Sequence, residues 1–178
     1  MKLHLGCGGD YLDGWVNVDK YDYVKDTSRT GSKYDIKADI LHLPFKRCSA
    51  TEVLIVHVLE HFYRWETIRV LKDFYRILRS GGRLTVEMPD LNKCVDWFIS
   101  GGRDGGKRIS TPLGPLNKGF TQFYGNQWDE LPYETHHYVW CMDEFVEVLQ
   151  QVGFKVESAD HTVKYHMRGR DMRVVSTR

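Results

Sequence analysis

The sequence predicts an α/β fold with a mostly parallel sheet and helices on both of its faces. Strand-like apolar runs alternate with segments of helical periodicity along the chain, which is typical of this class. A glycine-rich loop, Gly6 to Gly9, follows the first apolar run, and the carboxylate of Asp19 ends the next one. A glycine loop and an acid at neighbouring strand ends indicate a site for a nucleoside-type ligand.

Length and composition favour one soluble domain spanning residues 1–178, with a net charge of +1 and four widely spaced cysteines. Without a C-x-x-C pair, reduced thiols in the cytoplasm are expected. Near-neutral charge argues against a nucleic acid partner, and no apolar run is long enough to span a membrane. We therefore expect a cytoplasmic monomer or homodimer that acts on a small molecule.

The first two strands are expected at Leu3–Leu5 and Trp15–Asp19. Only ten residues separate Gly8 from Asp19, fewer than a helical crossover needs, so we predict a shortened first crossover. Tyr11 stands where the NAD fingerprint would have its third glycine, which disfavours an NAD enzyme.

The middle of the chain continues the alternation of strands and helices. Asp35–Ile40 and the β-branched run Thr51–Val56 predict two more strands. Trp65–Arg79 has apolar residues at helical spacing, and Gly81-Gly82 is expected to end that helix. A strand at Arg83–Met88 and a short helix from Asp90 to Ile99 follow.

Residues 100–138 interrupt this pattern with many glycines and aromatic residues. So long an insert in a small domain is usually functional, and we expect it to form a lid over the substrate. Asp143–Val152 predicts a last helix, and Lys155–Asp160 and Met172–Ser176 predict the last two strands. The basic segment 164–178 is expected to be a solvated surface.

Several short motifs occur along the chain. They are Leu5-Gly6-Cys7-Gly8, Gly14-Trp15-Val16-Asn17-Val18-Asp19, Asp39 to Phe45, His57-Val58-Leu59-Glu60-His61-Phe62, Tyr75 to Leu84, and Val152-Gly153-Phe154. These motifs resemble those of class I S-adenosylmethionine-dependent methyltransferases, over residues 1–90 and 135–178. The resemblance implies a Rossmann-like seven-stranded sheet, S-adenosylmethionine as cofactor and S-adenosylhomocysteine as product.

The resemblance also implies a role for each cofactor-binding residue. A carboxylate at the end of the second strand would accept both ribose hydroxyls, since it has two acceptor oxygens. The residues are Gly6, Cys7 and Gly8 against the methionine part, Asp19 on the ribose, Asp39 on the adenine amino group, Ile40 and Leu41 beside the ring, and His57 and Leu59 near the sulfonium.

The expected reaction is methyl transfer to an oxygen nucleophile of a small molecule, such as a hydroxyl of a sugar or glycan precursor. This choice of acceptor rests on the resemblance. Such a hydroxyl needs a base that titrates near neutrality, and histidine is the natural one. The catalytic candidates are His61, His137 and His57, and the substrate-binding candidates are Tyr124, Trp128 and His136.

Two alternatives remain open at the level of sequence. His57-x-x-Glu60-His61 matches the H-x-x-E-H signature of a zinc hydrolase, but it follows a β-branched strand where that motif needs a helix. We therefore expect no metal. The chain could also be a non-catalytic domain that binds S-adenosylmethionine or a protein partner.

Overall fold

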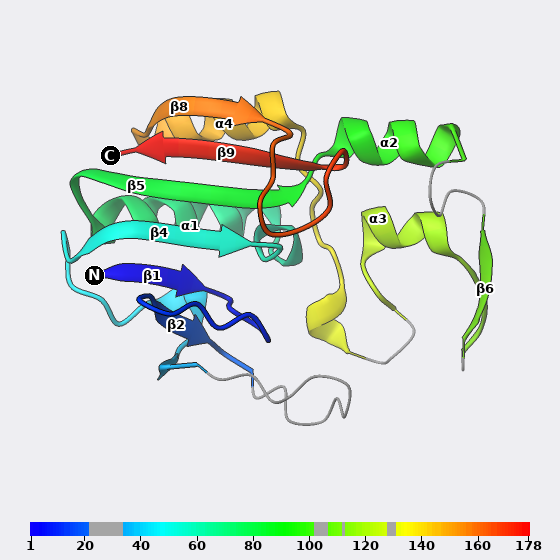
Figure 1. Cartoon of the computed structure of the whole chain (residues 1–178), viewed down its shortest axis with the longest axis horizontal. Coiled ribbons are helices and arrows are strands. Elements are labelled where there is room, and N and C mark those ends of the chain that lie inside the picture. The colour runs from blue at the N-terminus through cyan, green and yellow to red at the C-terminus, as the bar shows by residue number, and fades with distance from the viewer. Residues whose placement is uncertain (22–33, 102–106, 112, 128–130) are drawn as a thin grey trace.

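The computed structural model describes residues 1–21, 34–101, 107–111, 113–127 and 131–178. Its main feature is a seven-stranded sheet with the order β3-β2-β1-β4-β5-β9-β8 (Figure 1). The first five strands in this order are parallel, and β9 runs antiparallel between β5 and β8, so the expected mostly parallel sheet is confirmed. The strands are β1 (Lys2–Leu5), β2 (Val16–Asp19), β3 (Ile36–Lys37), β4 (Ala50–Val56), β5 (Leu78–Pro89), β8 (Lys155–Asp160) and β9 (Asp171–Thr177).

Two helices, α1 (Arg64–Ile77) and α4 (Met142–Val152), pack on one face of this sheet. Figure 1 shows both behind the strands. Because side chains alternate along a strand, every second residue of β1, β4 and β5 faces these helices. The resulting core is a continuous apolar cluster that includes Leu3, Leu5, Val53, Ile55, Leu84, Val86, Leu71, Phe74, Phe145 and Leu149.

The opposite face carries no helix in the described ranges, so the expectation of helices on both faces is met on one face only. A loop at residues 161–170 crosses this face in front of β4 and β5 (Figure 1). The backbone N–H groups of Lys164 and Tyr165 donate to the buried carboxylate of Glu87 at 2.9 Å each. On this face, the loop therefore provides hydrogen bonds to the polar side chain of Glu87, in the position where a helix with an apolar face was expected.

The shortened first crossover is confirmed, since β1 and β2 pair in parallel with only turns at residues 6–15. The buried amide of Asn17 holds these turns together. Its Nδ2 donates to the carbonyls of Leu12 at 3.0 Å and Trp15 at 3.2 Å, and its Oδ1 accepts from the Leu12 N–H at 3.0 Å. The Asn17 side chain thus satisfies backbone groups of these turns that would bond to each other within a crossover helix.

The helix α1 ends at Ile77, and β5 begins at Leu78 without a separating loop. The prediction that Gly81-Gly82 ends the helix was therefore wrong. These glycines lie inside the first part of β5, where its pairing with β4 changes register between Ala50 and Glu52.

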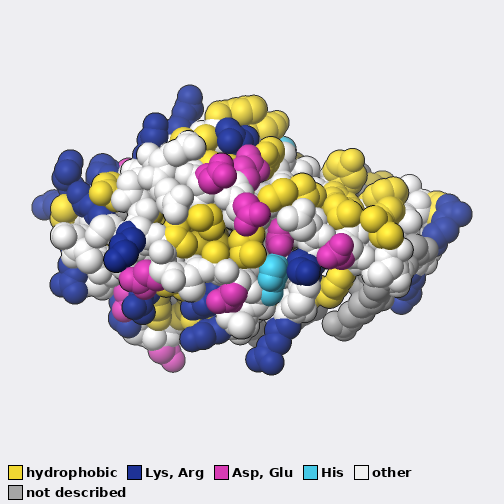
Figure 2. Space-filling model, turned by 90° about the horizontal axis from the view of Figure 1, so that it is seen from above, with side chains coloured by type: hydrophobic (Ala, Val, Ile, Leu, Met, Phe, Trp, Pro, Cys, Tyr) yellow, Lys and Arg dark blue, Asp and Glu magenta, His cyan; other side chains and the backbone are white. Residues whose placement is uncertain are grey.

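The insert after β5 has more regular structure than expected. Figure 1 shows it beyond the carboxyl ends of the strands, next to α2. Seen from above, on the side of β8 and α4, Figure 2 shows charges of both signs interspersed with apolar patches, and a further apolar group lies toward α2, where Ile99 is 77% exposed. The helix α2 (Leu91–Ile99) leads into the insert, whose elements include the antiparallel pair β6 (Arg108–Thr111) and β7 (Gly114–Asn117), and α3 (Thr121–Tyr124).

Within the described ranges, no helix has the length and apolar character needed to cross a bilayer.

Candidate active site

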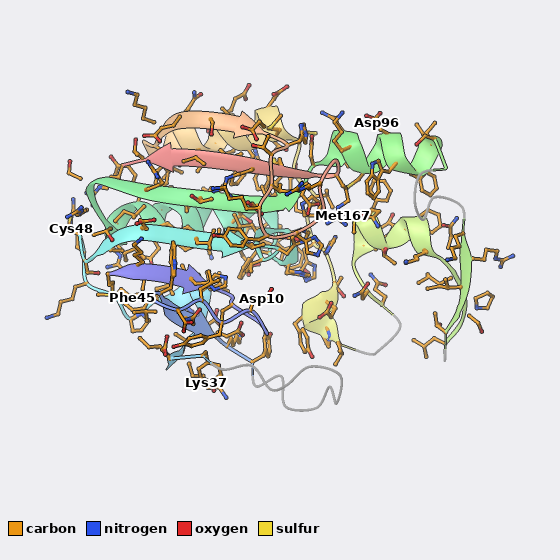
Figure 3. All side chains as sticks on the ribbon, in the orientation of Figure 1. Asp10, Lys37, Phe45, Cys48, Asp96 and Met167 are labelled. Carbon is orange, nitrogen blue, oxygen red and sulfur yellow. The ribbon has the colours of Figure 1, made fainter. Side chains whose placement is uncertain are left out.

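A cavity of about 530 Å³ opens at the carboxyl ends of the parallel strands, a size typical of small-molecule sites. Figure 3 labels two of its lining residues, Asp10 and Met167, at this edge of the sheet. Cys48 is labelled at the opposite edge. The cavity therefore lies at the carboxyl ends of the parallel strands, where a ligand site was expected. One wall comes from the ends of β1, β2, β3 and β4, and the other from the insert and the loop before β9.

The glycine loop forms the part of the cavity nearest β1. Gly6 and Gly8 adopt φ values of +68° and +52°, which glycine tolerates far better than other residues. A side chain at Gly6 would collide with Val58, whereas Gly8 faces open space. Burial and the charge of Asp19 raise the pKa of the Cys7 thiol to about 12, so Cys7 lines the loop as a neutral group.

The carboxylate of Asp19 is held rigidly at the end of β2 and is only 3% exposed. Its Oδ2 accepts from the Gly8 N–H at 2.8 Å, and its Oδ1 accepts from the Tyr21 N–H at 2.9 Å. Each carboxylate oxygen has a second lone pair. Asp19 can therefore still accept two hydroxyl groups, as a ribose would require.

The carboxylate of Asp39 lies on the same wall of the cavity, after β3, where it begins the short 3-10 turn η1 (Ile40–His42). Its Oδ1 accepts from the Leu41 N–H at 3.0 Å, and its Oδ2 lies 2.7 Å from the Lys20 Nζ. Burial opposes ionisation of Asp39, but the hydrogen bonds from Lys20 and the Leu41 N–H, together with the charge of Lys20, outweigh burial and keep the pKa below its usual value. Lys20 was not predicted from the sequence, because a lone lysine after a strand has no distinctive pattern.

His57 is clamped between two carboxylates where β4 enters the cavity. Its Nε2 lies 2.7 Å from Asp171 Oδ2, and its Nδ1 lies 2.9 Å from Glu60 Oε1. Burial lowers the pKa of this imidazole, but the charge of Glu60 and the hydrogen bond to Asp171 outweigh burial and raise it to about 9. His57 is therefore charged near neutrality and cannot serve there as the general base that the sequence analysis considered.

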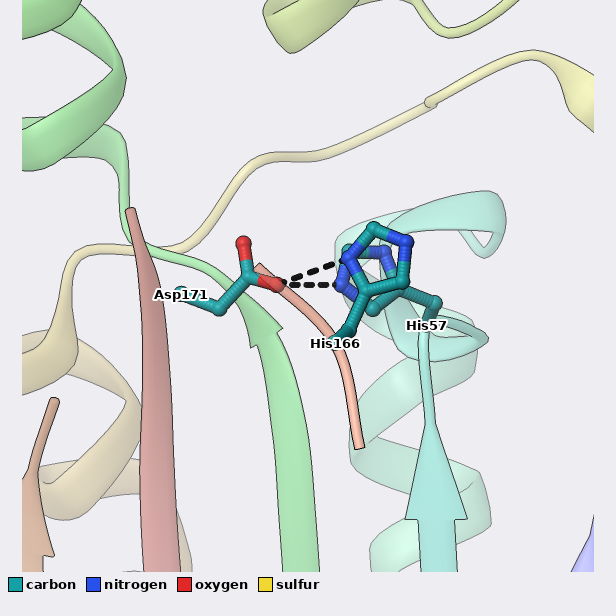
Figure 4. Close-up of side chains that lie close together, drawn as sticks. All are labelled: His57, His166 and Asp171. Carbon is teal, nitrogen blue, oxygen red and sulfur yellow. Dashed lines mark hydrogen bonds and ion pairs between the residues drawn. The ribbon is translucent and has the colours of Figure 1, made fainter. Parts of the chain in front are cut away.

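Figure 4 shows the second histidine of this cluster, His166, whose Nδ1 lies 3.0 Å from the same Asp171 oxygen. Arg170 also pairs with Asp171 and donates from Nη1 to the Gln122 side chain at 2.6 Å. These contacts keep the pKa of Asp171 well below its usual range, against the effect of burial. Arg170 is only 5% exposed, so the expectation that residues 164–178 are a solvated surface was wrong at this position.

Two other predicted histidines, His61 and His136, line the cavity on the side of the insert. Each directs Nδ1 at a backbone carbonyl, that of Thr135 at 3.0 Å for His61 and that of Gln122 at 3.3 Å for His136. Burial lowers the pKa of His136 to about 4, so this ring is uncharged near neutrality.

Three predicted residues, Leu59, His137 and Tyr124, lie outside the cavity lining. Leu59 is 1% exposed and packs in the core beneath the sheet, and its neighbour Val58 lines the cavity instead. His137 is exposed and lies outside the cavity lining, where its ring packs on the Tyr63 ring with 4.3 Å between the ring centroids. Tyr124 is 58% exposed and also lies outside it. Trp128 lies outside the described residues.

The geometry also rules out the H-x-x-E-H zinc hydrolase arrangement. In that motif both histidines lie on a helix and bind one ion. Here His57 follows a strand and is occupied by Asp171, whereas His61 lies at the end of a 3-10 turn and faces Glu60 and His136. The two histidines belong to different clusters.

The sheet order, the glycine loop and the acids at the ends of β2 and β3 define an α/β enzyme that binds a nucleoside-type cofactor. Comparisons with known proteins agree. A family model described as a methyltransferase domain matches residues 3–86. A protein of Encephalitozoon cuniculi (strain GB-M1) that is named as a methyltransferase is 27% identical over 170 residues, covering 88% of this chain and 70% of the relative.

Solved structures show the same fold. An S-adenosylmethionine-dependent methyltransferase from Archaeoglobus fulgidus superposes with a TM-score of 0.63 at 14% identity, covering 99% of this chain and 85% of its own. One from Thermotoga maritima has a TM-score of 0.60 at 16% identity and coverages of 99% and 81%. Together these likenesses support an S-adenosylmethionine-dependent methyltransferase, as the motifs predicted, with S-adenosylmethionine as its cofactor.

The residues present fit this cofactor. Gly8 leaves open space where a side chain would fill the cavity, and Asp19 and Asp39 offer carboxylate oxygens at two separate points of the same wall. Ile40 and Leu41 add apolar surface next to Asp39, which suits an adenine ring.

Proposed function

We propose that this enzyme transfers a methyl group to a hydroxyl of a small polar molecule, such as a sugar or glycan precursor. The observation that carries the proposal is the contrast between the two walls of one cavity. The β1–β3 wall has the glycine loop and acids that suit the cofactor, whereas the insert contributes hydrogen-bonding side chains. These side chains are Thr121, Gln122, Asn126, Glu134 and His136.

In this proposal each wall has a distinct task. The loop at Gly6 and Gly8 leaves room for the methionine end, Asp19 accepts the ribose hydroxyls, and Asp39 with Ile40 holds the adenine. S-adenosylmethionine supplies an electrophilic methyl on a positively charged sulfur. The protein contributes mainly by holding acceptor and donor in line at contact distance.

The insert at residues 100–138 is proposed to act as the lid on the acceptor. Its backbone is attached to the β4 end, because the N–H groups of His137 and Tyr138 donate to the Glu60 carbonyl at 2.7 Å and 3.2 Å. A wall that is anchored in this way can position the acceptor relative to the cofactor. His61 and His136 are the histidines that such an acceptor would meet, and they replace His137 and Tyr124 in our assignment.

Calorimetric titration with S-adenosylhomocysteine tests the cofactor side. Asp19→Asn should weaken binding by at least about tenfold, since each lost charge-assisted hydrogen bond is worth about 1.5–3 kcal/mol. Asp13→Asn is the matched control, because Asp13 is an exposed acid on the same loop and is absent from the cavity lining. Equal affinities in both variants would contradict the role of Asp19.

The acceptor side is tested by incubating the enzyme with S-adenosylmethionine and panels of sugar phosphates, nucleotide sugars and small amines. We expect methylated products from hydroxyl acceptors. Methylation of amines alone would contradict the oxygen nucleophile. Tight S-adenosylhomocysteine binding without any product would favour the non-catalytic alternative.

A further inference from the structure

A second cluster of ligating side chains lies on the acceptor side of the cavity. Glu60, His61 and His136 each place a ligating atom within 4.8 Å of the others. Glu60 and His61 follow β4, whereas His136 comes from the insert, 75 residues further along the chain. The fold, and not the local sequence, brings the three together.

The carboxylate of Glu60 is in an unusual environment. Its residue is 1% exposed, and within the described part of the chain neither oxygen receives a hydrogen bond of acceptable geometry. Oε1 lies 2.9 Å from the His57 Nδ1, so His57 provides a charge on that side only. A buried carboxylate is costly unless its oxygens are satisfied. Among the described residues, Glu60 Oε2 therefore has no partner that would offset the cost of its burial.

His61 and His136 are arranged as metal-binding histidines usually are. In both, Nδ1 is used by a backbone carbonyl, which leaves Nε2 as the nitrogen with an available lone pair. A carbonyl on the other ring nitrogen is the common way to orient a ligating histidine. The rings lie 5.0 Å apart between centroids, at an interplanar angle of 72°.

The neighbouring cluster of His57, His166 and Asp171 differs in this respect (Figure 4). There both imidazoles already bond to the same oxygen, Asp171 Oδ2, at 2.7 Å and 3.0 Å. That cluster is satisfied by its own contacts. No hydrogen bond of this kind joins Glu60, His61 and His136 to one another among the described residues.

We propose that Glu60, His61 and His136 bind one divalent transition metal ion, with Zn²⁺ as the best match. Two imidazole nitrogens and one carboxylate oxygen are a donor set that zinc accepts with further positions open, whereas Mg²⁺ and Ca²⁺ prefer oxygen donors. Since His61 and His136 both line the cavity, the open positions face the acceptor. This departs from the expectation that the chain binds no metal.

The use of such an ion rests on the proposed function. A hydroxyl bound to Zn²⁺ becomes more acidic, which is how zinc activates water. The hydroxyl proton would pass to water, the oxygen pair would form the new C–O bond, and the C–S bond would break with its pair on sulfur. The site would then replace the histidine base that sequence reasoning expected.

The first test is metal binding by the full chain after treatment with a chelator. We expect titration with ZnCl₂ to give one ion per chain and MgCl₂ to give no binding at the same concentrations. His136→Gln should weaken zinc binding by at least about 100-fold, while His137→Gln should leave it unchanged. His137 is the matched control because it is the adjacent residue but packs outside on Tyr63.

Co²⁺ provides a second readout, since its visible absorption reports coordination by protein ligands. Glu60→Gln should lose this signal, and circular dichroism would verify that the variant is folded. The proposal is overturned if the chain binds no zinc, if it binds Mg²⁺ in preference, or if His136→Gln and His137→Gln bind zinc equally. Parallel titration with S-adenosylhomocysteine separates the two proposals. An unmodified chain that binds S-adenosylhomocysteine but no zinc contradicts the metal site alone.

Discussion

Gly6→Ala is the substitution whose cost can be worked out most directly from the structure. Gly6 has a φ of +68°, and a Cβ there would lie 2.4 Å from the Val58 Cγ2. The left-handed conformation costs an alanine about 1–2 kcal/mol, and overpacking adds about 1–3 kcal/mol. We therefore expect a loss of about 2–5 kcal/mol in the free energy of unfolding, together with weaker binding of S-adenosylhomocysteine.

Urea unfolding monitored by circular dichroism measures this loss. Gly9→Ala is the control, because a Cβ at Gly9 meets no atom within 4 Å. It should change stability by less than about 1 kcal/mol. Combining Gly6→Ala with Val58→Ala should cost less than the sum of the two single changes, since the clash is removed while the strain remains. A Gly6→Ala protein within about 0.5 kcal/mol of wild type would refute the reasoning.

Three further outcomes follow from the buried charges and the thiols. Asp171→Asn should cost about 3–5 kcal/mol in the free energy of unfolding, because Arg170 and His57 lose their shared carboxylate. A thermal melt measures this cost. A cost below about 1 kcal/mol would contradict the stabilising role of Asp171. The pKa of Asp171 is lower in the folded than in the unfolded protein. Its contribution to the free energy of unfolding is therefore full above the unfolded pKa of about 4 and is lost as the pH falls below it. Urea unfolding between pH 7 and 3 should show a steeper loss of stability with acid in wild type than in Asp171→Asn. Iodoacetamide at pH 8 should label exposed Cys48 and spare buried Cys7, whose pKa is raised to about 12; equal labelling by mass spectrometry would contradict this.

Much of the wall that we propose for the cofactor could be located from sequence because its determinants are local. Gly6 and Gly8 are required by backbone conformation, Asp19 is the last residue of β2, and Asp39 follows shortly after β3. In a parallel sheet the carboxyl ends of the strands meet at one edge, so the order of elements alone predicts that these residues converge. The short spacing to Asp19 likewise predicted the missing crossover helix.

The acceptor wall could not be predicted in this way, because it depends on which side of an irregular segment faces the cavity. His136 and His137 are adjacent and chemically identical, and neighbouring side chains of an extended segment point to opposite sides. The hydrogen bond from the His137 N–H to the Glu60 carbonyl sets which one points inward. The same holds at Val58 and Leu59, where the turn after β4 directs one side chain to the cavity and the other to the core.

The sequence by itself therefore predicted a mostly parallel α/β fold and the wall proposed to hold a nucleoside-type ligand, since glycine conformations and strand ends are encoded by neighbouring residues. The resemblance of its motifs added the identity of the cofactor. Only the tertiary structure decided that His57 is a charged group held by Asp171, and that Glu60, His61 and His136 meet. These contacts join residues 75 to 114 positions apart. Their geometry depends on the packing of the insert and of the loop before β9 against the sheet, which no local pattern specifies.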